Sequence, residues 1–419
     1  MKRRTLLQAS LGSALLLALP ACTDDDGDGA SASSSNLPRD VADPAAAKEF
    51  AAAEAAFSWD FYRQLAAKDG NLFVSPFSIA NALAQVTAGA RGDTAAELQR
   101  ALHIDSLGDR AYAGAGALDL SLTSGANDDT FRLKVANSAW TQNGFAFEKP
   151  YLDLLARYFG SEMRSVDFKA AAEPARKEIN NWVADRTQGK IRDLMPEGSV
   201  TTLTRLVLAN AIYFNARWET EFHPSTTQEG DFKKLDGSNA RAQMMSRRGQ
   251  IAYSVGDRVS AVELPYKGGR FRMAILLPDE GTFAKFEATL DGAKVDMLLS
   301  AMKPGDIQLS MPKFAFSFAK SLKPAFQGLG VNLAFDDDRA DFSGMSIADR
   351  LYLSDIFHKA VVRVDERGTE ASAATGVVVN NTSMPREFRA DRPFIFLIRD
   401  SESGAVLFAG RLVEPVFDA

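Results

Sequence analysis

The chain has 419 residues, a formal net charge of −6 and a single cysteine. An acidic chain offers no broad basic surface for a polyanion, so we expect neither nucleic acid nor a heparin-like activator as a partner. One cysteine allows no disulfide within the folded part, whose stability must then come from burying the 46% of residues that are hydrophobic. The length is sufficient for a large core.

The first 21 residues have the layout of an export signal. A basic head at 2–4 precedes an apolar segment at 11–19, which is too short to span a bilayer as a permanent anchor. The two arginines resemble a twin-arginine signal, and "LPAC" at 19–22 resembles a bacterial lipobox. We therefore expect an exported lipoprotein, anchored through Cys22 at the bacterial cell surface or in the periplasm. If ordinary cleavage occurs instead, the protein is expected to be secreted.

Residues 22–49 are expected to form a lipidated, flexible tether. Most of this segment is acidic and rich in Ser, Gly and Ala, with few apolar residues, a composition that cannot bury a core. From Phe50 onward, helical and strand patterns are intermixed without a second linker. Residues 50–419 are therefore expected to be one domain.

The domain is predicted to be α+β, with helices concentrated early and strands late. Residues 50–67 are Ala-rich with aromatic residues at helical spacing, and a second amphipathic helix around Trp182 ends near Gly189. Two apolar runs of strand length, 206–214 and 272–278, are typical of strands buried on both faces. The segments "FIFLIRD" and "AVLFAGRLV", separated by "SESG", predict a hairpin at the end of the chain.

The sequence carries no catalytic motif. It has no G-x-S-x-G elbow, no H-E-x-x-H and no phosphate-binding glycine loop. The histidines are His103, His223 and His358, and none has another His or Cys at ligand spacing, so no metal site and no cofactor are expected. A Ser-His-Asp triad built from distant positions stays open as an alternative, but we do not expect an enzyme.

Five segments of the chain have the residues and the order of a known family. They are "NLFVSPFSIANALAQVTAGARGDTAAEL" (71–98), "INNWVADRTQGKIRDLM" (179–195), "LVLANAIYFNARWETEF" (206–222), "HKAVVRVDERGTEASAATGVVV" (358–379) and "FRADRPFIFLIRDSESGAVLFAGRLVEP" (388–415). Together they span the domain and resemble the serpin family of serine protease inhibitors. The resemblance implies the serpin fold, with three β-sheets, eight or nine helices and an exposed reactive-centre loop at about 366–388.

The resemblance also implies a function as a suicide-substrate inhibitor. A target protease attacks the loop, forms an acyl-enzyme and is trapped in a covalent complex when the cleaved loop inserts as a new strand of the central sheet. We expect a monomer that inhibits a serine or cysteine endopeptidase. The alternative is a non-inhibitory serpin that acts as a binding module or chaperone.

The hinge of the loop favours inhibition. The resemblance assigns to it Glu366, Gly368, Thr369, Glu370, Ala371, Ser372, Ala373, Ala374 and Thr375. Alternate residues of a strand share a face, so the residues from Thr369 to Thr375 with odd numbers would be buried together. All four are small and uncharged, whereas an unpaired charge on that face would be costly to bury. Glu370 falls on the other face.

The reactive bond is predicted at Thr382-Ser383. This is what the resemblance implies: with the commonest loop length of the family, counting forward from the hinge that starts at Gly368 and backward from Arg392 gives the same position. Slipped registers ending at Met384 or Arg386 are the alternatives. A threonine before the cut predicts an elastase-like or subtilisin-like target, whereas Arg386 would predict a trypsin-like one.

Five further residues match family positions that gate the central sheet. Ser75, Ser78, Asn210 and His358 match positions that hydrogen-bond beneath the sheet where it opens, and Trp218 matches a tryptophan near the point of first insertion. Loss of one partner would leave a buried polar group unpaired and loosen the gate. The ordinary alternative is that these groups make plain core hydrogen bonds, whose loss lowers stability without altering insertion.

Overall fold

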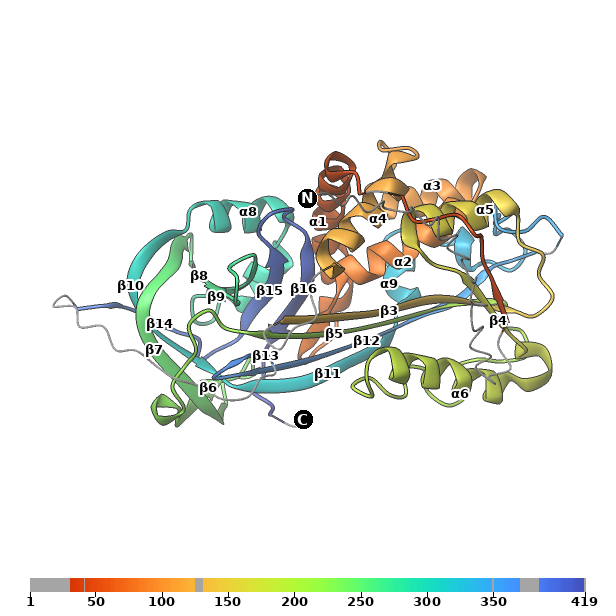
Figure 1. Cartoon of the computed structure of the whole chain (residues 1–419). Helices are drawn as coiled ribbons and strands as arrows, with labels where there is room; N and C mark the ends of the chain where they lie inside the picture. Colours follow the sequence, from red (N-terminus) through yellow and green to blue (C-terminus); the bar gives the residue numbers. More distant parts are fainter. Residues whose placement is uncertain (1–30, 41, 125–130, 349, 370–383, 418–419) are drawn as a thin grey trace, which may run out of the picture.

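The computed structural model describes residues 31–40, 42–124, 131–348, 350–369 and 384–417. Its first sheet has seven strands in the order β1-β4-β3-β5-β13-β12-β11 (Figure 1). Their bounds are β1 Ser31–Ser33, β3 Phe131–Gln142, β4 Met163–Val166, β5 Leu206–Arg217, β11 Phe314–Ser321, β12 Leu353–Asp365 and β13 Gly368–Thr369.

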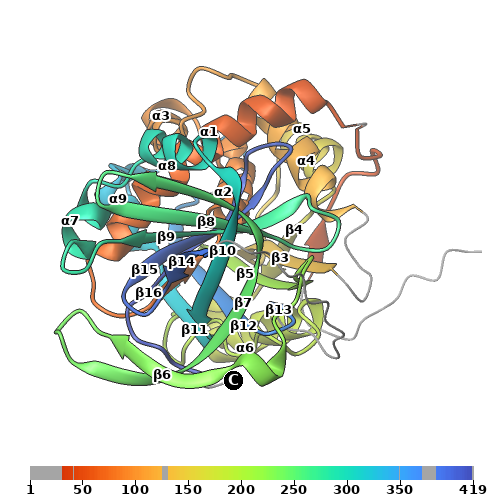
Figure 2. The same ribbon diagram turned by 90° about the vertical axis from the view of Figure 1, so that its left-hand side faces the viewer.

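The second sheet has nine strands, with β6 paired to β7 beside the path β14-β10-β7-β8-β9-β15-β16-β2. Their bounds are β2 Leu72–Val74, β6 Gln228–Lys233, β7 Asn239–Gly256, β8 Val259–Pro265, β9 Phe271–Pro278, β10 Lys303–Pro312, β14 Arg386–Arg389, β15 Phe394–Asp400 and β16 Val406–Leu412. Figure 2 looks at this sheet from the end of the molecule, with β7 and β10 in front. The resemblance implied three sheets. Strand β7 pairs with β10 along one part of its length and with β8 along the other, so two of the three form one continuous sheet.

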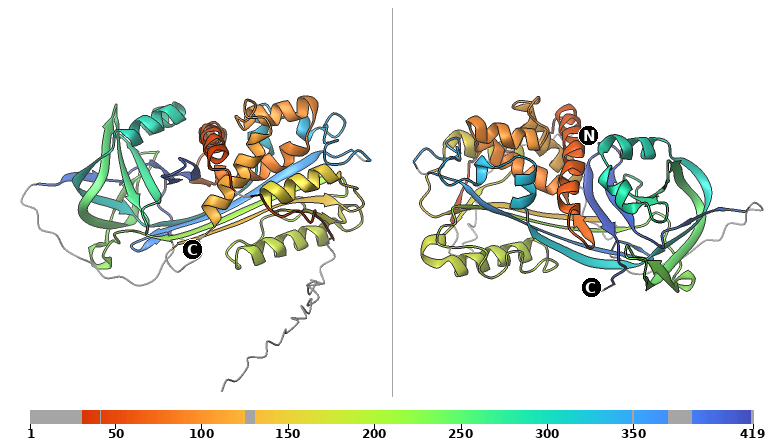
Figure 3. Two further views of the ribbon diagram at one scale, coloured as in Figure 1. Left: turned by 45° about the horizontal axis from the view of Figure 1, so that its top comes forward. Right: turned by 180° about the vertical axis from the view of Figure 1, so that it is seen from behind.

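The described residues form nine α-helices. Their bounds are α1 Pro44–Ala66, α2 Pro76–Gly89, α3 Gly92–Ala101, α4 Arg110–Thr123, α5 Lys149–Leu154, α6 Phe168–Arg186, α7 Phe283–Ala288, α8 Gly292–Ser300 and α9 Lys323–Gly328. Helices α1 to α5 lie on one side of the first sheet and α6 lies on the other (Figures 1 and 3). The α+β prediction and the expected helix number are therefore confirmed.

Both faces of β5 are buried, as its apolar run predicted. Leu208, Ile212 and Phe214 belong to the main core. Val207 and Tyr213, on the opposite face, pack in a second cluster with residues of α6. A strand covered on both sides must be almost wholly apolar, which is why this part of the chain was predictable. The C-terminal hairpin, β15 paired with β16, is confirmed as well.

The structure shortens the predicted tether. Helix α1 begins at Pro44, six residues before Phe50, because the Asp43 carboxylate accepts hydrogen bonds from the backbone N–H groups of Ala45 and Ala46 at 3.0 Å. Asp as the N-cap followed by Pro is a strong helix start. The alanines that follow Pro44 resemble the composition of a linker, and for this reason the helix start at Asp43 was not recognised in the sequence. Residues 31–33, also assigned to the tether, form strand β1 against β4.

Candidate functional site

The first sheet has a seam between β5 and β12. These strands run parallel and pair directly along residues 206–213 of β5 and 353–361 of β12. Beyond that stretch, β13 lies between them and is antiparallel to both. The sheet is thus closed along part of its length and already holds a third strand at one end.

Gly368 and Thr369, which form β13, are the described start of the predicted hinge. They pair with residues 216–217 on one side and 364–365 on the other, and Thr369 is 1% exposed. A Cβ added to Gly368 would lie 2.0 Å from the carbonyl oxygen of Ala216, so only glycine fits the entrance of the gap.

Two stacked aromatic residues hold the hinge in the gap. Trp218 and Tyr266 lie 4.5 Å apart between ring centres and are both buried. The indole N–H of Trp218 donates to the carbonyl of Asp365 at 3.0 Å, and the Tyr266 hydroxyl bonds the Thr369 hydroxyl at 2.9 Å. Burial raises the pKa of Tyr266 well above its usual value. Tyr266, which the sequence did not reveal, therefore lies with Trp218 against the start of the hinge.

Glu366 ties the base of the hinge to the second sheet. Its carboxylate accepts from Lys313 Nζ at 2.9 Å and from the Thr227 hydroxyl at 2.8 Å. Burial opposes ionisation, but these two hydrogen bonds outweigh it and hold the pKa of Glu366 below its usual value. The hinge therefore begins at an ionised carboxylate whose position is held by Lys313 and Thr227.

The predicted polar residues beneath the sheet do form one network. Ser75 caps α2 by accepting from the Ser78 N–H at 3.2 Å, and donates to the Leu407 carbonyl at 2.6 Å. The Asn210 amide donates to Ser78 Oγ at 2.8 Å and to Asn137 Oδ1 at 2.6 Å. Asn137, which the sequence analysis missed, also donates to the Ser78 carbonyl at 3.1 Å.

His358 closes the network across the seam. Its Nδ1 lies 2.5 Å from Asn210 Oδ1, and both residues are fully buried. Burial lowers the pKa of His358 to about 3, so the ring is neutral at physiological pH and its Nδ1–H donates to the amide oxygen. Since Asn210 belongs to β5 and His358 to β12, any strand inserted here must separate them.

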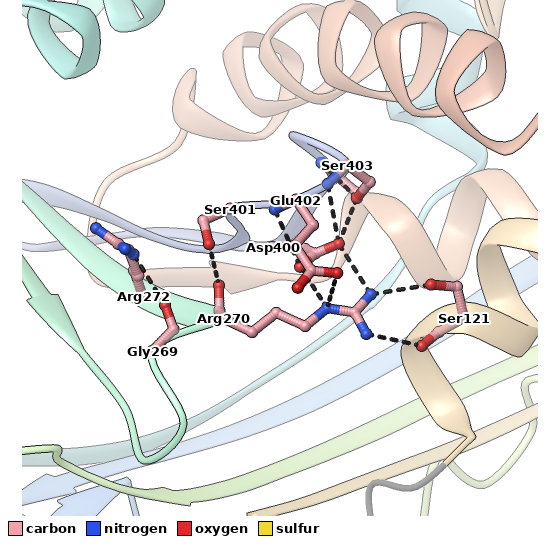
Figure 4. Close-up of polar contacts among 9 residues, drawn as sticks. Ser121, Gly269, Arg270, Arg272, Asp400, Ser401, Glu402 and Ser403 are labelled. Carbon is pink, nitrogen blue, oxygen red and sulfur yellow. Dashed lines mark hydrogen bonds and ion pairs between the residues drawn. The ribbon is translucent and has the colours of Figure 1, made fainter. Parts of the chain in front are cut away.

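The turn that carries Tyr266 is fixed at its far end by Arg270 (Figure 4). Arg270 pairs with the fully buried carboxylate of Asp400 at 2.7 Å and donates to the Ser121 carbonyl at 3.2 Å and hydroxyl at 2.9 Å. This arginine joins the last turn of α4 to the C-terminal hairpin. The position of Tyr266 therefore depends on a rigid anchor outside the first sheet.

Much of the predicted loop lies outside the described residues. This applies to Glu370, Ala371, Ser372, Ala373, Ala374, Thr375, Thr382 and Ser383, and at the other end of the chain to Cys22. Of the alternative reactive residues, Met384 is 97% exposed. Arg386 opens β14, paired with Ile307, and its guanidinium lies 5.1 Å from the ring centre of Tyr253. The reactive bond stays a prediction.

The described part of the chain contains no group of three or more His, Cys, Asp or Glu residues that could hold a metal ion. Among its helices, none is long and apolar enough to cross a membrane. The site therefore consists of the seam between β5 and β12, the hinge strand β13 that enters it, and the polar side chains that bond across it.

Comparisons with known proteins agree with this geometry. The family model described as Serpin (serine protease inhibitor) matches residues 52–415. An uncharacterized serpin-like protein of Thermococcus kodakarensis is 38% identical over 86% of this chain and 84% of its own. The leukocyte elastase inhibitor of Homo sapiens is 35% identical over 88% of this chain and 100% of its own.

Solved structures show the same likeness. Native tengpin, a thermophilic serpin, has a TM-score of 0.79 at 27% identity and covers 92% of this chain and 99% of its own. Uncleaved ovalbumin has a TM-score of 0.81 at 28% identity and covers 87% of this chain and all of its own.

Proposed function

Because the chain belongs to the serpin family, we propose that it is a suicide-substrate inhibitor of a serine or cysteine endopeptidase. The observation that carries the proposal is β13, the two-residue start of the loop that already lies between β5 and β12. A loop that begins inside the seam needs only to be released at its other end to continue as a strand. Cleavage by the target protease supplies that release.

The pairing of β13 fixes the register of further insertion. Thr369 lies opposite residue 216 of β5 and residue 364 of β12, so each later loop residue pairs one residue further back on both strands. Ala371 would then lie between Phe214 and Val362, which are both buried in the main core. A small, uncharged side chain is what this position can accept.

The charge of the hinge falls on the other face in the same register. Glu370 would lie between Asn215 and Arg363, and both of these side chains are partly exposed. A carboxylate beside a half-exposed guanidinium is tolerated or weakly favourable. The pattern of small and charged residues in the hinge therefore matches the two faces of the seam.

Insertion has to break one lock on the way. The register brings Thr375 between Asn210 and His358, whose side chains bond each other directly across the seam. This geometry supports the predicted gating role, because the bond between Asn210 and His358 must break before a strand can take its place. Fourteen residues from Thr369 to Thr382 would span roughly 45 Å, enough to carry a bound protease along the whole sheet.

The target class follows from the predicted reactive residue. Thr382 favours an elastase-like or subtilisin-like protease, and relatives of this chain in Homo sapiens and Sus scrofa are named leukocyte elastase inhibitors. We also propose that the protein is exported, is anchored by a lipid on Cys22, acts as a monomer and needs no polyanionic activator.

The proposal is tested by incubating the domain with elastase, subtilisin, trypsin and papain. An inhibitor gives an SDS-resistant covalent complex and a released peptide that begins at Ser383. A peptide beginning at Glu387 would move the reactive residue to Arg386. Clean cleavage by every protease, without a complex and without a gain in thermal stability, would identify a non-inhibitory serpin.

A pair of variants tests the insertion register. Ala371→Arg places a charge between two core strands and should convert the inhibitor into a substrate. Glu370→Arg puts the same side chain on the face that already carries a charge, so it should keep most of the inhibition. Equal inhibition by both variants would contradict the register.

A further inference from the structure

The described chain starts at one end of the first sheet. Cross-strand pairing puts Ser31, Ser165, Thr141 and Leu206 in one row across β1, β4, β3 and β5. Strand β1 is antiparallel to β4, and β4 is parallel to β3, so the chain before Ser31 leaves the sheet at the end away from the hinge. Figure 1 shows β4 at the opposite end of the molecule from β14.

Side-chain contacts fasten this exit point. Arg39 pairs with Asp119 on α4 at 2.9 Å, and Asp40 pairs with Arg157 at 2.9 Å. The Ser35 hydroxyl donates to Asp153 at 2.6 Å. Residues 31–40 are therefore bound along the edge of the body, and only eight residues, 23–30, lie between Cys22 and Ser31.

The same end of the sheet is where a trapped protease would arrive, a step that rests on the proposed function. Counted on from the pair Thr369–Ala216, Thr382 would come to lie three residue steps beyond Leu206, the first residue of β5. Four strand spacings separate the inserted strand from β1, which is about 19 Å sideways. After insertion, the acyl bond at Thr382 would therefore lie roughly 20 Å from Ser31.

The reach of the anchor is shorter than the width of a protease. Nine residue steps from Cys22 to Ser31 span at most about 31 Å. A protease of about 230 residues has a radius of gyration near 17 Å and so a diameter of about 45 Å. A membrane held by Cys22 therefore lies within the space that the protease must enter.

We propose that this end of the molecule, the receiving pole, faces the membrane of the anchored protein. The receiving pole consists of Ser31 and the loops 199–205 and 345–348. The Tyr352 hydroxyl donates to the Leu203 carbonyl of the first loop, and the Glu148 backbone N–H donates to the Met345 carbonyl of the second. Leu203 is 68% and Ile347 is 74% exposed, and such side chains suit contact with a bilayer interface. A protease carried to this pole therefore meets a gap that the short anchor holds narrower than the protease itself.

The lone cysteine allows a direct test, whether or not the cell lipidates it. Ser31→Cys and Ser165→Cys, which stand opposite each other, are joined by a disulfide that keeps β1 on β4. Cys22 is then coupled to a maleimide phospholipid in phosphatidylcholine vesicles, or is blocked with N-ethylmaleimide and left in solution. A matched protein carries a flexible Gly/Ser segment of about 20 residues after Cys22.

The stoichiometry of inhibition is measured for each form with the same protease. We expect the vesicle-bound, short-tether protein to consume at least threefold more inhibitor per protease than the soluble form, and the long tether to restore the soluble value. Equal values for all three overturn the proposal, as does a rise that the long tether leaves unchanged. Failure of the soluble form to make a complex would instead refute the proposed function.

Discussion

Acid should loosen the seam through His358. Burial lowers the pKa of this histidine from 6.5 to about 3, so the closed seam holds the ring neutral. While β5 and β12 are parted and no strand yet fills the gap, water reaches the ring, which can then bind a proton with its ordinary affinity. A depressed histidine pKa means that the closed state is fully favoured above pH 6.5 and loses that advantage as the pH falls towards 3.

The size of the effect follows from the shift. Between pH 6.5 and 3, each pH unit costs the closed state about 1.4 kcal/mol relative to an open state with a titrating histidine. At pH 5 the loss is on the order of 2 kcal/mol, or roughly 30-fold in the opening equilibrium. His358→Gln can still donate to the Asn210 oxygen but cannot be protonated, so it should remove this pH dependence.

The assay is uptake of a synthetic peptide with the sequence of residues 369–382, followed by native gel electrophoresis. The wild-type chain should take up the peptide at least tenfold faster at pH 5 than at pH 7.5, whereas His358→Gln should respond little. The reasoning fails if the wild-type rate is the same at both pH values, or if the variant shows the same slope.

Three further predictions concern other buried groups. Burial raises the pKa of Glu54 from 4.5 to about 8, so the stability of the wild-type protein should fall as the pH rises through this range. Glu54→Gln should therefore raise the urea midpoint of unfolding at pH 9 but not at pH 4. Equal shifts of the midpoint at both pH values would contradict this prediction. Gly368→Ala should drive β13 out of the gap and speed amide exchange along residues 364–369; unchanged exchange would show that the hinge tolerates a Cβ. Tyr266→Phe and Thr369→Val should each cost about 1–2 kcal/mol of unfolding free energy, and the double variant less than their sum; strict additivity would mean that the 2.9 Å hydroxyl contact contributes nothing.

The sequence predicted those parts of the site that depend on local pattern. The apolar run of β5 indicated a strand buried on both faces, and the small residues of the hinge indicated a segment that can be buried. Asn137 and Tyr266 were missed because their roles exist only in three dimensions. Asn137 reaches Ser78 from 59 residues away, and Tyr266 reaches Thr369 from 103 residues away. No spacing rule links residues on such distant strands.

The sequence also did not predict that the hinge enters the seam between β5 and β12. Small residues predict that the loop can be buried, but not how far it is buried before cleavage. The described part of the hinge lies in the seam as far as Thr369, where Tyr266 bonds it and the paired Glu366 holds its base. A pattern of side-chain size gives the capacity for insertion, whereas the contacts of the surrounding strands set its extent.

Two locks therefore act in series along the seam. The first, at Thr369, is already occupied by the loop, so it stabilises the uncleaved state instead of opposing insertion. The second, between Asn210 and His358, lies six residues further along, or about 20 Å. Residues 370–374 can pair with the strands before the second lock is touched. Insertion has to part the directly paired strands β5 and β12 from Tyr213 and Val361 onward. An intermediate should accumulate where it must also break the buried side-chain bond between Asn210 and His358. Asn210→Ala would remove the Asn210–His358 bond, so it should abolish the intermediate while leaving the hinge at Thr369 in place. An intermediate that persists in this variant would locate the barrier elsewhere in the seam.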